Sequence, residues 1–214
     1  MVGRERQEIF SIAIVGFGPK GFYAFERLLA QLRAFEIQKP IAIHLFNQNE
    51  FFAAGNVYRP DQPSYLLMNY ANSNINCWTE EEPPAIITNT PDFVSWLQSK
   101  PAYSSEAKPE AFASRAMVGS YLMESFARLC SHLPENIELV KHVQKVTDIE
   151  RAGKKYRLFT AGHKPNDHPE FDEIMLTTGH LGCGAAFLEE SHSNSYIDFV
   201  YPTDLALGHI ESGA

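Results

Sequence analysis

The sequence has few cysteines, few cations and no long apolar run, and each scarcity excludes a class of protein. Its three cysteines form no Cys-x-x-Cys pair, so we expect a reduced, cytoplasmic protein without a disulfide framework. Eighteen Lys and Arg against 26 Asp and Glu leave a net charge of −8, which disfavours nucleic-acid binding because phosphate neutralisation needs clustered cations. No stretch approaches the roughly 18 apolar residues of a membrane span, and residues 1–8 lack the form of a signal peptide.

Signatures of hydrolytic and metal chemistry are also missing. There is no Gly-x-Ser-x-Gly elbow, no His-Glu-x-x-His and no Cys–His nucleophile with supporting spacing. One metal-like group falls in a polar turn, where two histidines five positions apart share neither a helix face nor a strand face. Its members are His163, Asp167, His168, Glu170 and Asp172. We expect a solvated loop there and another at the acidic run 80–82, and we predict neither a metal site nor a catalytic residue.

The apolar content predicts a globular α/β protein. With 214 residues, 44% apolar and 21% charged, the chain can build one large domain or two small ones. Residues 10–15 and 41–46 are nearly continuous apolar strands, typical of a parallel sheet. Between them lie a glycine-rich turn and a helical pattern with Phe22, Phe25, Leu28, Leu29 and Leu32 on one face. This order is one βαβ unit.

The remaining chain predicts further elements. Residues 47–91 have no sustained period, and so long an irregular stretch is usually functional. A short helix over 91–98 with proline in its first turn, a polar linker over 102–110 and a long helix capped by Ser114 and reaching residue 133 follow. Strands are expected over 137–140, 143–149, 156–160 and 171–177, the middle pair joined by a hairpin-like turn at 151–154.

The strongest motif is a Gly-x-Gly-x-x-Gly placed between a strand and a helix. Gly16 permits the tight turn, Gly18 lets a pyrophosphate approach the backbone, and Gly21 lets the helix pack on the sheet. Pro19 suits the first helical turn. Pro19 and Lys20 begin the helix, where free backbone amides and the helix dipole bind phosphate groups. We predict a dinucleotide site; a glycine turn without ligand is the alternative. No Gly-Lys-Ser/Thr follows, which excludes a P-loop.

The second strand ends without the usual acid. Dinucleotide enzymes commonly place a carboxylate there for ribose hydroxyls, whereas this chain has Asn47, with Glu50 three residues on. An asparagine side chain can accept from a hydroxyl and also donate. Asn47 therefore either contacts the ribose or simply ends the strand, and its presence weakens an NAD site relative to FAD.

Several stretches together resemble a mostly uncharacterised bacterial flavoprotein family, specifically its FAD/NAD(P)-binding domain. It is more distantly similar to flavin monooxygenases that hydroxylate amines. The resemblance covers nearly the whole chain and rests on the fingerprint and on residues 55–62, 66–69, 91–97 and 112–122, with 172–180 similar to the strand and Ala-Thr-Gly turn of two-dinucleotide flavoproteins. The first Ala of that turn is Thr177 here.

The resemblance implies roles for further residues. Thr178 and Gly179 would pass close to the flavin nucleotide, Arg115 would pair with the pyrophosphate or cover the ribityl chain, and Asn69 would bond the flavin ring or ribityl hydroxyls. The backbone amide of Val143 would meet the adenine edge. His180 follows the turn, but no substrate geometry supports an acid–base role for it, and Arg115 could also be an ordinary surface arginine.

We expect a three-layer α/β fold: a Rossmann-type parallel FAD/NAD(P)-binding sheet, helices on both faces, and an antiparallel β-meander inserted before the last parallel strand. The expected function is an FAD-dependent oxidoreductase or monooxygenase, with NAD(P)H as reductant by resemblance. Because the chain has one fingerprint, we expect residues 1–214 to be a single domain, the N-terminal portion of a longer enzyme. A non-catalytic nucleotide-binding module and, less favoured, an S-adenosylmethionine methyltransferase are the alternatives.

Overall fold

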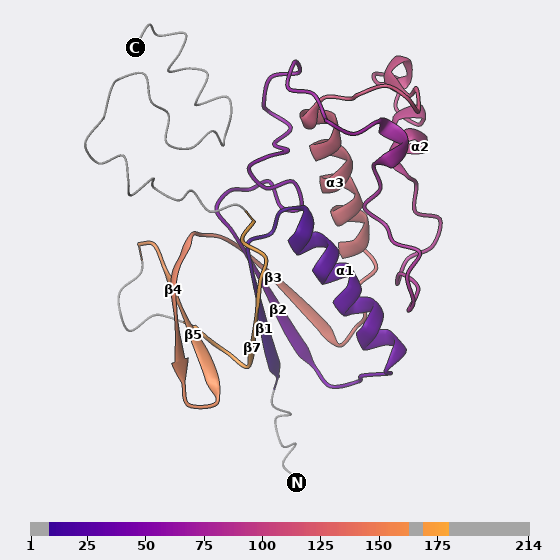
Figure 1. Cartoon of the computed structure of the whole chain (residues 1–214). Coiled ribbons are helices and arrows are strands. Elements are labelled where there is room, and N and C mark those ends of the chain that lie inside the picture. Colours follow the sequence, from indigo (N-terminus) through magenta and orange to yellow (C-terminus); the bar gives the residue numbers. More distant parts are fainter. Residues whose placement is uncertain (1–8, 163–168, 180–214) are drawn as a thin grey trace, which may run out of the picture.

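The computed structural model describes residues 9–162 and 169–179, and a four-stranded parallel sheet forms its centre (Figure 1). Its strand order is β3-β2-β1-β7 and all three pairings are parallel. The strands are β1 (Phe10–Val15), β2 (Ile41–Asn47), β3 (Ile137–Val143) and β7 (Glu173–Leu176). Helix α1 (Pro19–Ala34) connects β1 to β2. The βαβ unit predicted from the sequence is confirmed.

Two helices cover one face of this sheet. Because side chains alternate along a strand, Ile12 and Ile14 of β1 and Ile43 of β2 all reach that face and are buried there. Helix α1 and helix α3 (Arg115–Cys130) pack over them with their apolar stripes. Short helix α2 (Phe93–Gln98) joins the same core. Figure 1 shows the three helices on this one side of the parallel strands.

A second, antiparallel sheet covers the opposite face. Strands β4 (Val146–Ala152), β5 (Lys155–Thr160) and β6 (Glu170–Phe171) pair in that order. Leu158 and Phe171 pack on Ala13 and Val15 of β1. The predicted meander before the last parallel strand is therefore confirmed. The expectation of helices on both faces is wrong for the described residues, because strand side chains bury this face instead.

Asp172 joins the two sheets at the point where the chain passes between them. One carboxylate oxygen accepts hydrogen bonds from the Ser11 amide and hydroxyl, both at 2.8 Å, and the other lies 3.1 Å from Lys155 Nζ. Burial opposes ionisation, but the contacts with Ser11 and Lys155 outweigh it and hold the Asp172 pKa below its ordinary value. Glu170 pairs with Arg157. These two acids are thus structural, and the prediction of a solvated loop is wrong for them.

Several boundaries differ from those predicted. The run 171–177 serves two sheets, since Phe171 pairs with Tyr156 and residues 173–176 pair with β1. Val143 ends β3 and does not begin the next strand. Helix α2 starts after its N-cap Asp92, which excludes Pro91 from its first turn.

Other predictions are confirmed or need small corrections. Ser114 caps α3 by accepting from the Met117 amide at 3.2 Å. The helix ends at Cys130 and does not reach residue 133, because Pro134 disfavours a helical residue before it. Two 3-10 turns, Asn72–Asn74 and Ser104–Glu106, interrupt the segments expected to be irregular. Among the described helices, none has the length and apolar character that a membrane span needs.

Candidate functional site

Gly16 closes the turn between β1 and α1 by packing on the end of β7. Its φ is +87°, and a Cβ there would lie 2.7 Å from the Thr177 carbonyl oxygen and 2.7 Å from the Thr178 Cα. A Cβ at Gly21 would lie 2.5 Å from the Gly16 carbonyl oxygen. Both glycines are therefore required by the protein's own packing. They hold the start of α1 against the sheet, the geometry that the fingerprint predicts.

Gly18 differs from its two neighbours in the motif because it has open space beside it. A Cβ at Gly18 would meet only the Gly55 Cα, at 3.8 Å, among the described atoms outside its chain neighbours. Gly18 is the N-cap of α1, Pro19 occupies the first helical position, and the first turn carries no acidic residue. The amides of Lys20 and Gly21 lie in this turn, where no preceding helical carbonyl is available. The turn thus presents amides and the positive end of a helix to an open space.

The Thr177–Gly179 turn lies directly against the glycine turn. The Thr177 amide donates to the Val15 carbonyl at 2.9 Å, and its hydroxyl donates to the Gly16 carbonyl. Thr178 and Gly179 follow and are exposed. Gly179 has φ +71°, a conformation that suits glycine. The two segments singled out in the sequence, more than 150 residues apart, therefore form one surface.

A loop after β2 supplies a wall that the sequence reasoning did not assign. The Ala53 amide donates to the Phe17 carbonyl at 2.8 Å, which places the loop on the glycine turn. Gly55 has φ +61°, and a Cβ there would lie 3.0 Å from the Gly18 Cα. Gly55 is therefore part of the candidate site. The signal available in the sequence was a glycine within the stretch 55–62 that carries the family resemblance.

Asn47 and Val143 lie side by side at the carboxyl ends of β2 and β3, where their registers pair them. The side-chain oxygen Oδ1 of Asn47 accepts from the Phe17 amide at 3.3 Å, and the side-chain NH₂ group donates to the backbone and side-chain oxygens of Asn49. Asn47 thus ties the strand end to the glycine turn, and its oxygen keeps one lone pair for a further donor. The Gln144 amide donates to the backbone carbonyl of Asn47 in β2. Because successive residues of a strand alternate in direction, the Val143 amide points away from β2.

Asn69 and Arg115 come together through a short antiparallel pairing of two loops. Leu67 forms a bridge with Ser114, and the Met68 amide donates to the Ala113 carbonyl at 2.9 Å. The Arg115 guanidinium donates to the Leu67 carbonyl at 3.3 Å and is half-buried. Asn69 is exposed at the end of this pairing. The two residues therefore share one loop cluster beside the start of α3.

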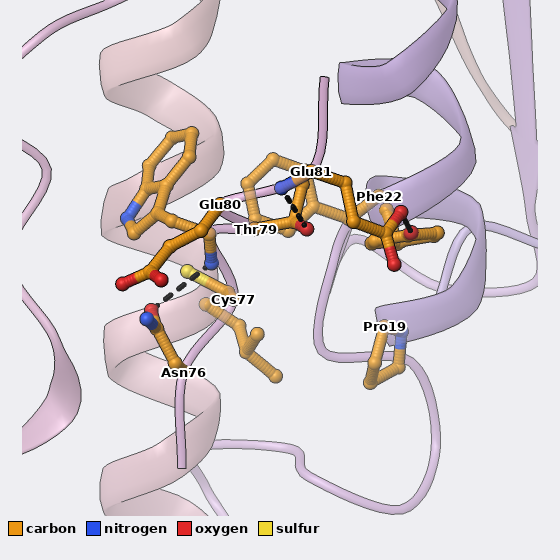
Figure 2. Close-up of a pocket in the computed structure, with 10 residues that line it drawn as sticks. Pro19, Phe22, Asn76, Cys77, Thr79, Glu80 and Glu81 are labelled. Carbon is orange, nitrogen blue, oxygen red and sulfur yellow. Dashed lines mark hydrogen bonds between the residues drawn. The ribbon is translucent and has the colours of Figure 1, made fainter. Parts of the chain in front are cut away.

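A cavity of about 710 Å³ opens beside the first turn of α1. Figure 2 shows Pro19 and Phe22 of α1 on one side, where Glu81 overlaps Phe22 in this view, and Asn76 and Cys77 on the other. Leu122 of α3 also lines it. Because Pro19 belongs to the fingerprint, the cavity adjoins the candidate phosphate turn.

The described residues contain no metal cluster and no activated thiol. No group of three or more His, Cys, Asp or Glu among them could hold a metal ion. Burial raises the pKa of the Cys77 thiol to about 11 and that of Cys130 to about 11, so both are neutral thiols near pH 7. His163, Asp167, His168, His180 and Cys183 lie outside the described residues.

Known proteins match this chain over most of its length. A family model described as FAD-NAD(P)-binding matches residues 13–181. An L-aspartate N-monooxygenase (nitrosuccinate-forming) of Streptomyces davaonensis is 24% identical over 95% of this chain and 35% of its own length. The nitrosuccinic acid synthase npaA of Aspergillus oryzae is 27% identical over 79% of this chain and 26% of its own length.

Solved structures are similar at a lower level. A flavin-containing monooxygenase from Stenotrophomonas maltophilia is 12% identical, with a TM-score of 0.46, over 80% of this chain and 38% of that one. The chain spans about a third or less of the length of the two relatives named above. The family model, in contrast, matches well over half of this chain and includes both turns of the candidate site. The chain belongs to the FAD-NAD(P)-binding family.

Proposed function

We propose that this chain is the FAD-binding portion of an FAD-dependent oxidoreductase. The observation that carries the proposal is the open space at Gly18, bounded by helix-start amides and by the backbone of Gly55. A backbone cradle that only a Cβ would fill fits a pyrophosphate, because phosphate oxygens accept from amides and favour the positive helix end. Family membership favours a dinucleotide over any other phosphate ligand.

Different residues of the site would contact different parts of the dinucleotide. The amides of Gly18, Lys20 and Gly21 would bind the pyrophosphate, with the exposed Lys20 ammonium adding positive charge. Gly16 and Pro19 would shape the turn that presents these amides. This assignment makes Gly18 the position where a side chain would compete directly with the ligand.

The strand ends and loops would hold the two halves of FAD. Asn47 would bond a ribose hydroxyl through its remaining lone pair, and the outward Val143 amide would meet the adenine edge. Thr178 and Gly179 would border the flavin side, where Arg115 and Asn69 would reach the ribityl chain or ring. When bound, FAD supplies electron transfer, and the protein supplies binding and orientation.

NAD(P)H is the proposed reductant of the full reaction. A relative's name specifies N-oxygenation of L-aspartate, so oxygenation of an amine is the reaction class to test first. We further propose a single domain over residues 1–214 and a cytoplasmic location. The methyltransferase alternative gains no support from the family match. A nucleotide-binding module without turnover remains the second candidate, favoured by the single fingerprint.

The direct test is the visible spectrum of the purified protein after FAD is added and excess FAD is removed. We expect a protein-bound flavin spectrum with shifted and structured bands. Flavin that washes off completely from folded protein would contradict the proposal. Bound flavin that no NAD(P)H reduces, in the complete protein as well as in this chain, would favour the non-catalytic module.

A further inference from the structure

We propose that the cavity of Figure 2 binds an organic ammonium ion with an apolar body. This inference deepens the proposed function, on which it rests for the view that such an amine is the substrate. The relatives' printed substrate, L-aspartate, is an amine that also carries two carboxylates. The cavity's own chemistry argues for a different amine.

The cavity has apolar and aromatic walls. Phe22 and Trp78 meet edge to face at 5.7 Å between ring centroids, and Leu122 and Pro19 extend the apolar surface. Trp78 is 7% exposed, so its ring forms a wall and does not project into solvent. Aromatic faces attract cations through the ring quadrupole, and they also take up apolar groups.

The charge on the cavity is of one sign. Among the ten described residues that line it, Glu80 and Glu81 are acidic and none is basic. The nearby Arg27 does not offset them, since its guanidinium is held by the buried Glu26 at 2.6 and 2.9 Å. An ammonium group is therefore attracted, whereas a carboxylate such as those of L-aspartate is repelled. The acidic run predicted to be only a solvated loop thus becomes the polar rim of a cavity.

The acidic wall is held in place before any ligand arrives. The Glu81 carboxylate accepts from the Tyr23 hydroxyl at 2.9 Å, and Arg27 donates to the Glu81 and Pro83 carbonyls at 2.9 and 2.7 Å. Arg33 donates to two further carbonyls in the same loop. A wall fixed by five hydrogen bonds from α1 reduces the ordering that binding would require.

The test uses probes that share a ring and differ in charge. Isothermal titration of the FAD-loaded and FAD-free chain compares 2-phenylethylamine, 3-phenylpropionate, 2-phenylethanol and L-aspartate at neutral pH. We expect 2-phenylethylamine to bind at least tenfold more tightly than 3-phenylpropionate, 2-phenylethanol to lie between them, and L-aspartate not to bind. Equal affinities for the amine and the acid, or no binding of the amine at millimolar concentration, would overturn the inference.

Two double variants localise the effect. Glu80→Gln with Glu81→Gln should weaken 2-phenylethylamine roughly tenfold, since each exposed ion pair contributes modestly, and a glutamine oxygen still accepts from Tyr23. Glu82→Gln with Glu110→Gln removes the same charge from exposed residues outside the lining and should leave affinity unchanged. Equal weakening of amine binding by the two double variants would contradict the assignment of the amine to this cavity. If the unmodified chain prefers the amine but does not bind FAD, only the proposed function is refuted.

Discussion

Replacing Gly18 with alanine distinguishes a glycine required by the ligand from one required by the fold. A Cβ at Gly18 meets the Gly55 Cα at 3.8 Å, an ordinary contact, and the φ of −84° is accessible to alanine. A Cβ at Gly16 would lie 2.7 Å from the Thr177 carbonyl oxygen, at a φ of +87°. Gly18→Ala should therefore fold normally and lose FAD affinity, whereas Gly16→Ala should lose stability.

The magnitudes follow from these contacts. For Gly18→Ala, alanine lowers unfolded-state entropy by about 0.4–1 kcal/mol, but it caps a helix less well than glycine. We expect the net change in unfolding free energy to stay below about 1 kcal/mol. A methyl group pressed on a bound phosphate overpacks by about 1–3 kcal/mol, which raises the FAD Kd about 5- to 150-fold. For Gly16→Ala, left-handed strain of about 1–2 kcal/mol adds to overpacking of about 1–3 kcal/mol.

The assay measures both quantities on each variant. Urea unfolding followed by circular dichroism reports stability, and titration with FAD followed by flavin fluorescence reports Kd. Gly153→Ala is the matched control, since Gly153 has φ +66° in the β4–β5 turn with no described atom within 4 Å. It should show strain alone and unchanged FAD affinity. A folded Gly18→Ala variant with wild-type Kd would refute the placement of the pyrophosphate, and a loss of stability equal to that of Gly16→Ala would refute the packing argument.

Three further predictions concern packing, pH and reduction. Gly119 lies inside α3, where alanine is ordinarily favoured over glycine, but a Cβ there would overlap the Tyr58 carbonyl oxygen. We expect Gly119→Ala to lose about 2–4 kcal/mol in urea unfolding, and a loss below about 1 kcal/mol would contradict the packing seen at this position. His44 and His142 share a 2.9 Å hydrogen bond, and burial lowers the pKa of both below 6.5. The unfolded chain therefore binds more protons below that pH, so stability should fall as the pH drops from about 7 to about 5. This fall should be less steep in His142→Phe than in the wild type, and it should be unchanged in the exposed control His132→Gln. Equal slopes in the wild type and both variants would contradict this prediction. NADH or NADPH added without oxygen to the FAD-loaded chain should not bleach the flavin within seconds, because one fingerprint leaves no second site to position the nicotinamide; stoichiometric bleaching would show that the site exists.

Strand β1, the glycine turn and helix α1 could be predicted from sequence because their signals are local. An apolar run, three glycines at fixed spacing and an amphipathic helix determine β1, the turn and α1 without reference to distant residues. The Ser114 cap was predictable for the same reason, since it acts on an amide three residues away.

Other features depended on the tertiary structure. Strand periodicity shows that a face is buried but does not show what buries it. The sequence therefore predicted the antiparallel meander, but it did not show that this meander, and not further helices, covers the face opposite α1 and α3. The division of 171–177 likewise depends on Asp172 meeting Ser11, 161 residues away.

The candidate site shows the same division. The sequence determined that Gly16, Gly18 and Gly21 form a turn, but it could not show that Gly16 and Gly21 serve packing while Gly18 faces open space. That difference depends on Thr177 and Gly55, which local patterns do not connect to the turn. The sequence shows that Glu80 and Glu81 are acidic, but it does not show that they lie at the rim of a cavity. Only their long-range hydrogen bonds to α1 place them there, because irregular segments have no periodicity from which their tertiary contacts follow.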